Sequence, residues 1–282
     1  MRKLFTFIAS VALLSFVGCS SATTAVADNN PYIGKDISTY LIGEHISVSD
    51  AKAKLTAAGF EIVTTYEPVK KGTTIVFTND ALKAEGAKPG RAFAAVLRLF
   101  VDDKEKMISI TNPVYFGKAF MQDDFNYDIF ATQLASINTA FPALKDSTDK
   151  FGYDKLAGFH FMMGMPYYEE PDLLAEAAND VLLAKANKYK KGKLKLFELK
   201  LSDNSTLLGY ELSKRTNKFV EKVGRANAAI LPWCVSIENA KATALNAKYY
   251  IAISYPLLDM GQFMGIATVP GAITKELEKP FK

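Results

Sequence analysis

Gly90-Arg-Ala-Phe-Ala-Ala-Val-Leu97 is nearly repeated later in the chain as Gly224-Arg-Ala-Asn-Ala-Ala-Ile-Leu231, with six of the eight positions identical. A second pair follows in the same order, because Ile108-Ser-Ile-Thr-Asn-Pro113 resembles Ile251-Ala-Ile-Ser-Tyr-Pro256. In both places a Phe-Met pair comes seven and eight residues after the proline. Similar segments in one order are typical of an internal duplication, so we predict two copies of one structural unit.

Both copies show the same order of predicted elements, the first within residues 35–150 and the second within residues 151–282. Residue patterning in the first copy predicts strands at 37–42, 60–66, 73–78, 96–101 and 107–111, and helices at 51–58, 80–85 and 125–139. In the second copy it predicts strands at 156–163, 194–201, 206–211, 230–237 and 249–254, and helices at 169–188, 213–223 and 273–279. The strand connections are too short for parallel crossovers. We therefore predict an α+β fold of two tandem β-α-β(4)-α units with mostly antiparallel sheets.

Several short segments resemble the domain-of-unknown-function family numbered 302. The segments in the first copy are Ser47-Val-Ser-Asp-Ala-Lys-Ala-Lys-Leu55 with Gly59-Phe60, Thr74-Ile-Val-Phe77, Ala95-Val-Leu-Arg-Leu-Phe-Val-Asp-Asp103 and Ile108–Pro113. Those in the second are Ala229-Ile-Leu-Pro-Trp233 and Ile251–Pro256. The family's Gly-Asn-Pro after its third strand is missing at Tyr210-Glu211. The resemblance implies a fold similar to the TATA-binding-protein half-domain and implies no particular activity.

The N-terminus has the pattern of a bacterial export signal. Arg2-Lys3 precedes the uncharged apolar run Leu4–Val17, and Phe16-Val-Gly-Cys19 then resembles the lipobox of bacterial lipoproteins. We predict that residues 1–18 are removed, that Cys19 is lipidated, and that residues 19–34 form the lipidated N-terminus and a flexible tether. Ser20 after the cysteine favours the periplasmic face of the outer membrane. The alternative is cleavage after Ala25-Val-Ala27, which would release a soluble periplasmic protein.

The composition excludes several classes of protein. The formal net charge is +4, and Arg2 and Lys3 of the leader account for two of the positive charges, so the remainder is close to neutral. A dedicated nucleic-acid-binding protein normally carries a strong basic excess, so no nucleic-acid partner is predicted. Two cysteines, Cys19 and Cys234, cannot build a disulfide framework or a cysteine-rich metal site. Nucleotide-binding, zinc-protease and serine-hydrolase motifs are absent, and no cofactor is predicted.

Four residues are the candidates for binding a ligand. Arg91 and Arg225 occupy the same place in the repeated stretch and could present two guanidinium groups to an anion. The competing interpretation is that each Gly-Arg forms a turn with an exposed arginine. Tyr115 and Phe116 begin an aromatic cluster that could line an apolar groove or belong to the core.

His160 and Met162 are the candidates for a metal site. Imidazole and thioether groups together suit copper or haem iron. On the predicted strand, His160 and Met162 share one face while Met163 and Met165 face the other, which divides the cluster. Packing is therefore the favoured interpretation. Cys234, next to Trp233 in a predicted strand, is expected to be a core residue.

These observations favour a non-catalytic protein of the cell envelope over an enzyme. The expected partners are the membrane, through the lipid anchor, and a small or lipidic ligand or an envelope protein bound between the two copies. One alternative is a periplasmic metal- or haem-binding redox accessory protein that uses His160 and the methionines. The other is an enzyme of unrecognised type.

Overall fold

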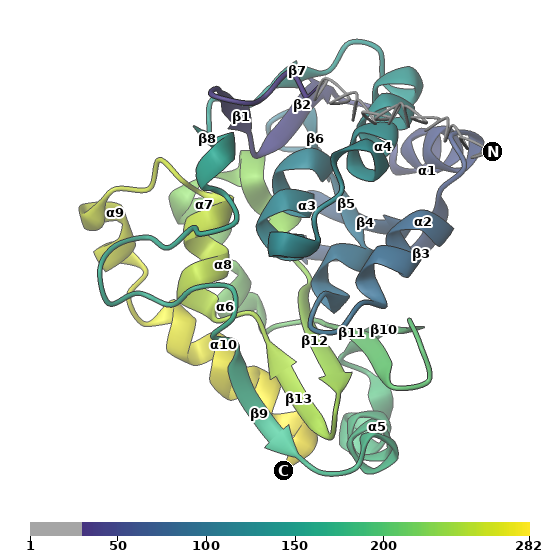
Figure 1. Ribbon diagram of the computed structural model, residues 1–282, viewed down its shortest axis with the longest axis vertical. Coiled ribbons are helices and arrows are strands. Elements are labelled where there is room, and N and C mark those ends of the chain that lie inside the picture. Colours follow the sequence, from purple (N-terminus) through teal and green to yellow (C-terminus); the bar gives the residue numbers. More distant parts are fainter. Residues whose placement is uncertain (1–29) are drawn as a thin grey trace, which may run out of the picture. The chain divides into compact units, whose positions relative to one another are not determined.

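The computed structural model describes residues 30–282, in which residues 32–282 form one compact unit (Figure 1). Three sheets are present in this part of the chain, and all their strand pairs are antiparallel. Helices and antiparallel sheets together confirm the predicted α+β class. Among these residues, no helix has both the length and the apolar character needed to cross a membrane.

The two large sheets have the same strand order. The first runs β3-β4-β5-β6-β2-β7 and contains β2 (Tyr40–Glu44), β3 (Glu61–Val69), β4 (Gly72–Thr78), β5 (Leu97–Asp102), β6 (Met107–Thr111) and β7 (Lys145–Asp146). The second runs β10-β11-β12-β13-β9 and contains β9 (Asp172–Glu176), β10 (Lys195–Lys200), β11 (Ser205–Tyr210), β12 (Trp233–Glu238) and β13 (Lys241–Ala244). A third, two-stranded sheet pairs β1 (Asp36–Ser38) with β8 (Lys150–Gly152). If β7 is left aside, the strand that comes first in the sequence of each large sheet pairs with the strand that comes last. These pairs are β2 with β6 and β9 with β13.

Helices occur at matching places in the two halves. The first half has α1 (Val48–Ala57), α2 (Asp80–Gly86), the 3₁₀ helix η1 (Ala92–Ala95), α3 (Pro113–Met121), η2 (Gln122–Asp124) and α4 (Tyr127–Ala140). The second has α5 (Asn179–Lys188), η4 (Tyr189–Gly192), α6 (Lys214–Asn217), α7 (Phe219–Val223), η5 (Arg225–Ile230), α8 (Ala247–Ser254), α9 (Met260–Gly265), α10 (Val269–Glu278) and η6 (Lys279–Phe281), while η3 (Tyr153–Lys155) lies between the halves. Asn79 caps α2 and Ser213, 134 positions later, caps α6 with its hydroxyl. The two halves therefore share an order of elements, which is what the predicted duplication requires.

The second of the two sequence pairings was wrong. Residues Ile108–Thr111 lie in strand β6, but Ile251–Ser254 lie in helix α8. The strand at the place of β6 is β13, which begins at Lys241, 134 positions after the start of β6 at Met107. Asn246 explains the difference, because its side chain accepts the N–H of Lys248 and starts a helix where alternating apolar residues had indicated a strand.

Other boundaries also differ from the prediction. Residues 156–171 contain no strand, since Gly158, Gly164, Pro166 and Pro171 interrupt the segment. The helix predicted at 169–188 begins only at Asn179, after strand β9. Helix α3 was not predicted, although a capping asparagine followed by proline at the first helical position favours a helix start.

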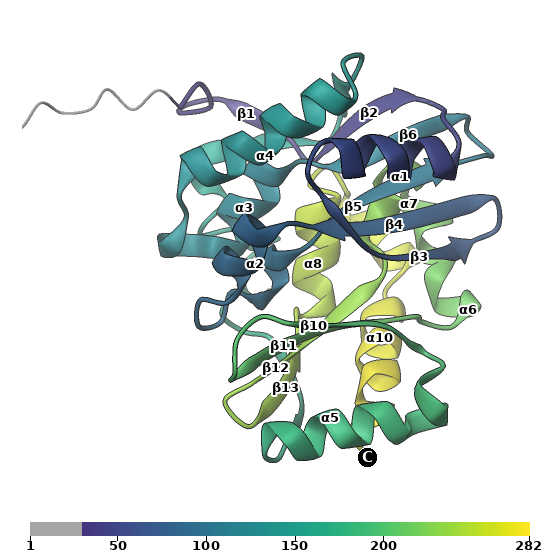
Figure 2. The ribbon, with the colours of Figure 1, turned by 90° about the vertical axis from the view of Figure 1, so that its right-hand side faces the viewer.

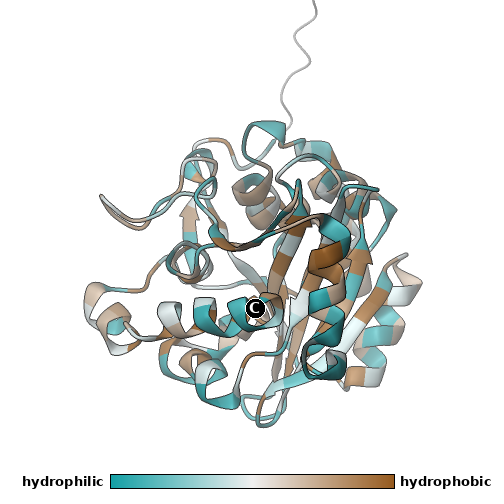
Figure 3. Ribbon diagram, turned by 90° about the horizontal axis from the view of Figure 1, so that it is seen from below, coloured by the Kyte–Doolittle hydropathy of each residue, from teal (hydrophilic) through white to brown (hydrophobic). Residues whose placement is uncertain are grey.

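The repeated stretch lies where the two halves meet. In Figure 2 the first sheet lies above the second, and their edge strands β3 and β10 are neighbours without pairing. The 3₁₀ helix η1 of the first half packs against β11 and β12, while η5 of the second half packs against β5 and β6. Brown hydrophobic segments follow the central strands in Figure 3. The repeated sequence is therefore an interface element used by both halves.

Helices α3 and α8 exchange the same hydrogen bond in both directions. The hydroxyl of Tyr115 on α3 donates to the carbonyl of Ile253 on α8, at 2.8 Å. The hydroxyl of Tyr249 on α8 donates to the carbonyl of Ala119 on α3, at 3.2 Å. Tyr249 lies 134 positions after Tyr115, and Ile253 lies 134 positions after Ala119. Such reciprocity is the pattern of a two-fold interface, realised here within one chain.

Candidate functional site

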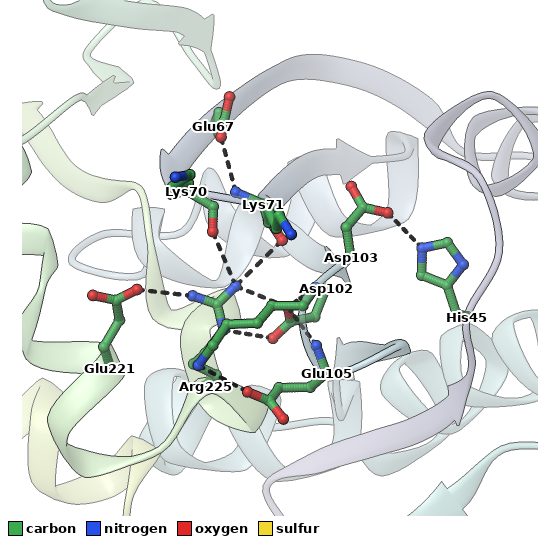
Figure 4. A network of polar contacts seen from close by, with 10 residues as sticks. His45, Glu67, Lys70, Lys71, Asp102, Asp103, Glu105, Glu221 and Arg225 are labelled. Atoms are coloured by element: carbon green, nitrogen blue, oxygen red, sulfur yellow. Dashed lines mark hydrogen bonds and ion pairs between the residues drawn. The ribbon is translucent and has the colours of Figure 1, made fainter.

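Arg225 is held in an internal ion pair between the halves. Its Nε and Nη2 donate to the two carboxylate oxygens of Asp102, each at 2.8 Å, and Asp102 at the end of β5 is fully buried. Nη1 donates to Glu221 at 3.1 Å, and Nη2 also reaches the carbonyls of Lys70 and Lys71 (Figure 4). The arginine thus joins α7 and η5 of the second half to the β3–β4 turn of the first.

The charge of Asp102 is stabilised by these contacts. Burial by itself raises the pKa of a carboxyl. Hydrogen bonds from Arg225 and from the N–H groups of Lys104 and Glu105 outweigh burial and hold the pKa of Asp102 below its ordinary value. The same hydrogen bonding raises the pKa of Arg225. Both partners are therefore charged at neutral pH.

Arg91 has separate partners. Its Nε donates to Asp124 at 2.9 Å and its Nη1 to Glu169 at 2.7 Å, and its guanidinium lies 5.5 Å from the ring centre of Tyr168. The hydroxyl of Tyr168 in turn donates to the carbonyl of Gly90 at 2.8 Å. The two repeated arginines are each held by acidic groups, so neither presents an unpaired guanidinium to a ligand.

The aromatic candidates lie on helix α3, which contacts the second half through Tyr115. Tyr115 is fully buried and Phe116 is buried, and both are in α3. The ring of Phe116 packs edge-on against Tyr40 and against Tyr115, with centroids 5.5 and 5.1 Å apart. The structure therefore places these side chains in the core.

His160 and Met162 lie in the loop between η3 and β9. The imidazole of His160 packs against Tyr167 with ring centroids 4.4 Å apart, while the Met162 side chain is exposed. Because no strand forms here, the predicted alternation of faces does not exist. Within residues 30–282, no three His, Cys, Asp or Glu side chains gather in a group that could hold a metal. Cys234 is buried in β12, as expected for a core residue.

A cleft lies beside the Arg225 ion pair and is open to solvent on the surface. Its volume is about 360 Å³, and its walls are the end of β3 with the β3–β4 turn in the first half and the segment of α6 and α7 in the second. The residues that line it are Glu67, Pro68, Val69, Lys70, Lys214, Lys218 and Glu221. The size falls within the range of small-molecule sites. We call it the lysine cleft.

The lysine cleft carries uncompensated positive charge. Glu221 is paired with Arg225, whereas Glu67 accepts only the backbone N–H of Lys71 at 3.0 Å and keeps its charge. The side chains of the three lysines form no ion pair with any residue in 30–282. The buried Asn217 donates to the carbonyl of Pro68 at 3.1 Å and fixes α6 against the turn. The walls are thus held in place, with cations facing an apolar floor of Pro68 and Val69.

Sequence reasoning had not singled out this cleft, because its lysines come from segments 144 or more positions apart that show no shared motif. One signal of positive charge was present, because the basic segment Lys214–Val223 directly precedes the repeated stretch at Gly224. The predicted lipidation site, Cys19, lies outside the described residues.

Comparisons of the chain with protein-family models, with curated proteins and with solved structures found no match. The resemblance to family 302 stays a prediction that rests on the other quoted segments and on the order of elements, because Ile251–Ser254 forms a helix and not the matching strand.

Proposed function

We propose that this protein is a non-catalytic binding protein that holds a small anionic ligand in the lysine cleft. The observation that carries the proposal is the charge balance of the cleft, in which Lys70, Lys214 and Lys218 form no ion pair and outnumber the one carboxylate, Glu67, that is not paired with Arg225. Lysine ammonium groups bind phosphate and carboxylate groups as point charges. The apolar floor favours a ligand whose anionic group is attached to an organic body.

Support also comes from the position of the cleft. Its two walls belong to different halves, and the Arg225–Asp102 pair and the Asn217–Pro68 hydrogen bond hold them in register. Sites at the junction of two units are common among ligand-binding proteins. A preorganised cleft loses less conformational entropy on binding, which favours affinity.

Calorimetric titration tests the proposal with inorganic phosphate, pyrophosphate, citrate and glycerol phosphate as ligands. We expect the wild type to bind at least one of them, with an affinity that falls as salt is added. The triple variant Lys70→Ser, Lys214→Ser, Lys218→Ser should bind at least about tenfold more weakly, since each cation contributes on the order of 1 kcal/mol at a partly screened site.

A matched variant separates the cleft from net charge. Lys155→Ser, Lys248→Ser, Lys275→Ser removes the same number of charges from exposed lysines outside the cleft. This control should bind like the wild type. Equal weakening in the two triple variants, or no binding of any of the four anions by the wild type, would refute the lysine cleft as the site.

We also propose that the protein is an envelope lipoprotein anchored through Cys19, on the basis of the leader sequence. The intact mass of the protein purified from a bacterial membrane fraction should show a lipidated Cys19 as the first residue. A mass that starts at Asp28 without lipid would favour the soluble periplasmic alternative.

A further inference from the structure

Arg98 is a buried cation without an acidic partner. It is the second residue of β5, and only 4% of its surface is exposed. Its Nη2 donates to the carbonyl of Pro232 at 3.3 Å and lies 3.1 Å from Sγ of Cys234, while its Nε has no hydrogen-bond partner. No carboxylate of residues 30–282 is within ion-pair distance of it. An unpaired buried charge is costly, so such groups are normally neutralised by a counter-charge.

The groups that face Arg98 do not supply that counter-charge. They are the hydroxyls of Tyr40, Tyr66 and Tyr250 and the thiol of Cys234. Burial raises the pKa of Tyr250 to about 12 and also raises the pKa of the Cys234 thiol. All four groups are therefore neutral at pH 7, and the guanidinium keeps its net charge.

A small cavity adjoins the guanidinium group between the two halves. It is lined by Arg98, Trp233, Cys234 and Tyr250 together with three apolar side chains, and its volume is about 10 Å³. That is close to the space one water molecule needs. The indole N–H of Trp233, like Nε of Arg98, has no hydrogen-bond partner. The cavity is therefore lined by a buried cation, by two residues that each carry an unpaired N–H, and by no carboxylate.

We propose that this cavity binds a single monatomic anion of the halide class. A halide accepts hydrogen bonds from N–H donors and donates none, which matches the donors left unpaired here. It also neutralises Arg98 in an apolar surrounding. A water molecule would fill the space but would leave the charge of Arg98 uncompensated. The site is separate from the lysine cleft, to which it contributes no residue.

The direct test is the anomalous diffraction of wild-type crystals in which bromide replaces chloride. We expect a bromide peak inside the cavity, within hydrogen-bonding distance of Nε of Arg98 or the indole nitrogen of Trp233. An ordinary water at that position with no anomalous signal, or bromide only on the protein surface, would overturn the proposal. This test needs no substitution and does not depend on the folding of any variant.

Thermal unfolding gives a second, independent readout. Sodium chloride and sodium bromide should raise the Tm of the wild type relative to sodium gluconate at equal ionic strength, because gluconate cannot enter the cavity. A change of about fivefold in the folding equilibrium corresponds to about 2–4 °C for a chain of this size. Arg98→Met, which keeps an unbranched apolar side chain without the charge, should lose the halide dependence, whereas the lysine-cleft triple variant should keep it. A halide effect equal in the wild type and Arg98→Met would contradict a site at Arg98.

Discussion

Arg91 and Arg225 occupy the same position of a repeated stretch, 134 residues apart, yet they have different environments. Arg225 is buried and grips the fully buried Asp102 with two hydrogen bonds. Arg91 binds Asp124 and Glu169, both of which are largely solvent-exposed. The residue 134 positions after Asp102 is Ser236, which carries no charge. The repeated stretch therefore has the same local sequence in both halves, while the acidic residues nearby determine which ion pairs each arginine forms.

This difference also explains why the lysine cleft lies on one side only. Arg225 connects α7 to the β3–β4 turn, and that connection forms one end of the cleft. Arg91 instead ties the repeated stretch of the first half to η2 and to the loop before β9. The two similar stretches thus have different roles. The stretch with Arg225 connects the halves beside the lysine cleft, and the stretch with Arg91 contacts solvent-exposed acidic residues.

The largest expected effect is the loss of the buried ion pair. Arg225→Ala should lower the free energy of unfolding by about 3–5 kcal/mol, because it leaves the carboxylate of Asp102 buried and unpaired. Arg91→Ala should lower it by at most about 1 kcal/mol, since its partners are exposed to solvent. Urea denaturation followed by circular dichroism measures both values. Similar losses in the two variants would mean that the environments do not differ as described.

Smaller losses of unfolding free energy, equal to each other, are expected when either of the tyrosine hydrogen bonds between the halves is removed. Tyr115→Phe and Tyr249→Phe each remove one hydrogen bond between α3 and α8 and keep the buried ring. Each should cost about 1 kcal/mol of unfolding free energy. Urea denaturation of both single variants checks the reciprocity. A loss confined to one of them would show that the two bonds are not equivalent.

The smallest expected effect is the change of the unfolding free energy with pH, which has opposite signs for Asp102 and Asp149. The pKa of Asp102 lies below its ordinary value of 3.8, so its contribution is present above that value and is lost as pH falls through its folded-state pKa. Burial outweighs the hydrogen bond from Asn227 and raises the pKa of Asp149, so ionising Asp149 costs stability as pH rises from 3.8 through its raised folded-state pKa. The folded protein therefore favours the charged form of Asp102 and disfavours the charged form of Asp149.

Unfolding free energies measured from pH 3 to pH 7 distinguish the two. The advantage of the wild type over Asp102→Asn should grow as pH rises toward 3.8 and then level off. The advantage of the wild type over Asp149→Asn should shrink as pH rises above 3.8. Parallel curves for the two variants would contradict the assigned pKa directions.

The sequence predicted the parts of the fold that depend on local patterns. The class, the repeated stretch and most strands of the first half followed from alternation and capping residues such as Ser47. Strand β13, which reads Lys-Ala-Thr-Ala, was missed because it lacks large β-branched residues, and Ile251-Ala-Ile-Ser was assigned in its place. A pattern of period two in a short apolar segment does not distinguish a buried helix from a strand.

The candidate sites depended on contacts between residues distant in sequence. Nothing near Arg225 in the sequence indicates that Asp102 is its partner, because the two lie in different halves. Arg98 did give a local signal, since a charged residue inside the apolar strand Leu97–Val101 is unusual. Which groups surround it became clear only when β5 and β12 came together in the structure.

We expect the two halves to unfold as a single cooperative unit, because the lysine cleft, the Arg225 ion pair and the tyrosine hydrogen bonds each need residues of both halves. Trp233 is the sole tryptophan and reports on β12 and its junction with the first half, whereas far-ultraviolet circular dichroism reports on the secondary structure of both halves. In equilibrium urea unfolding, we predict that tryptophan fluorescence and circular dichroism give the same midpoint and the same slope. Two separated transitions, or a loss of circular dichroism before the fluorescence of Trp233 changes, would show that the halves unfold independently and would contradict a single cooperative unit.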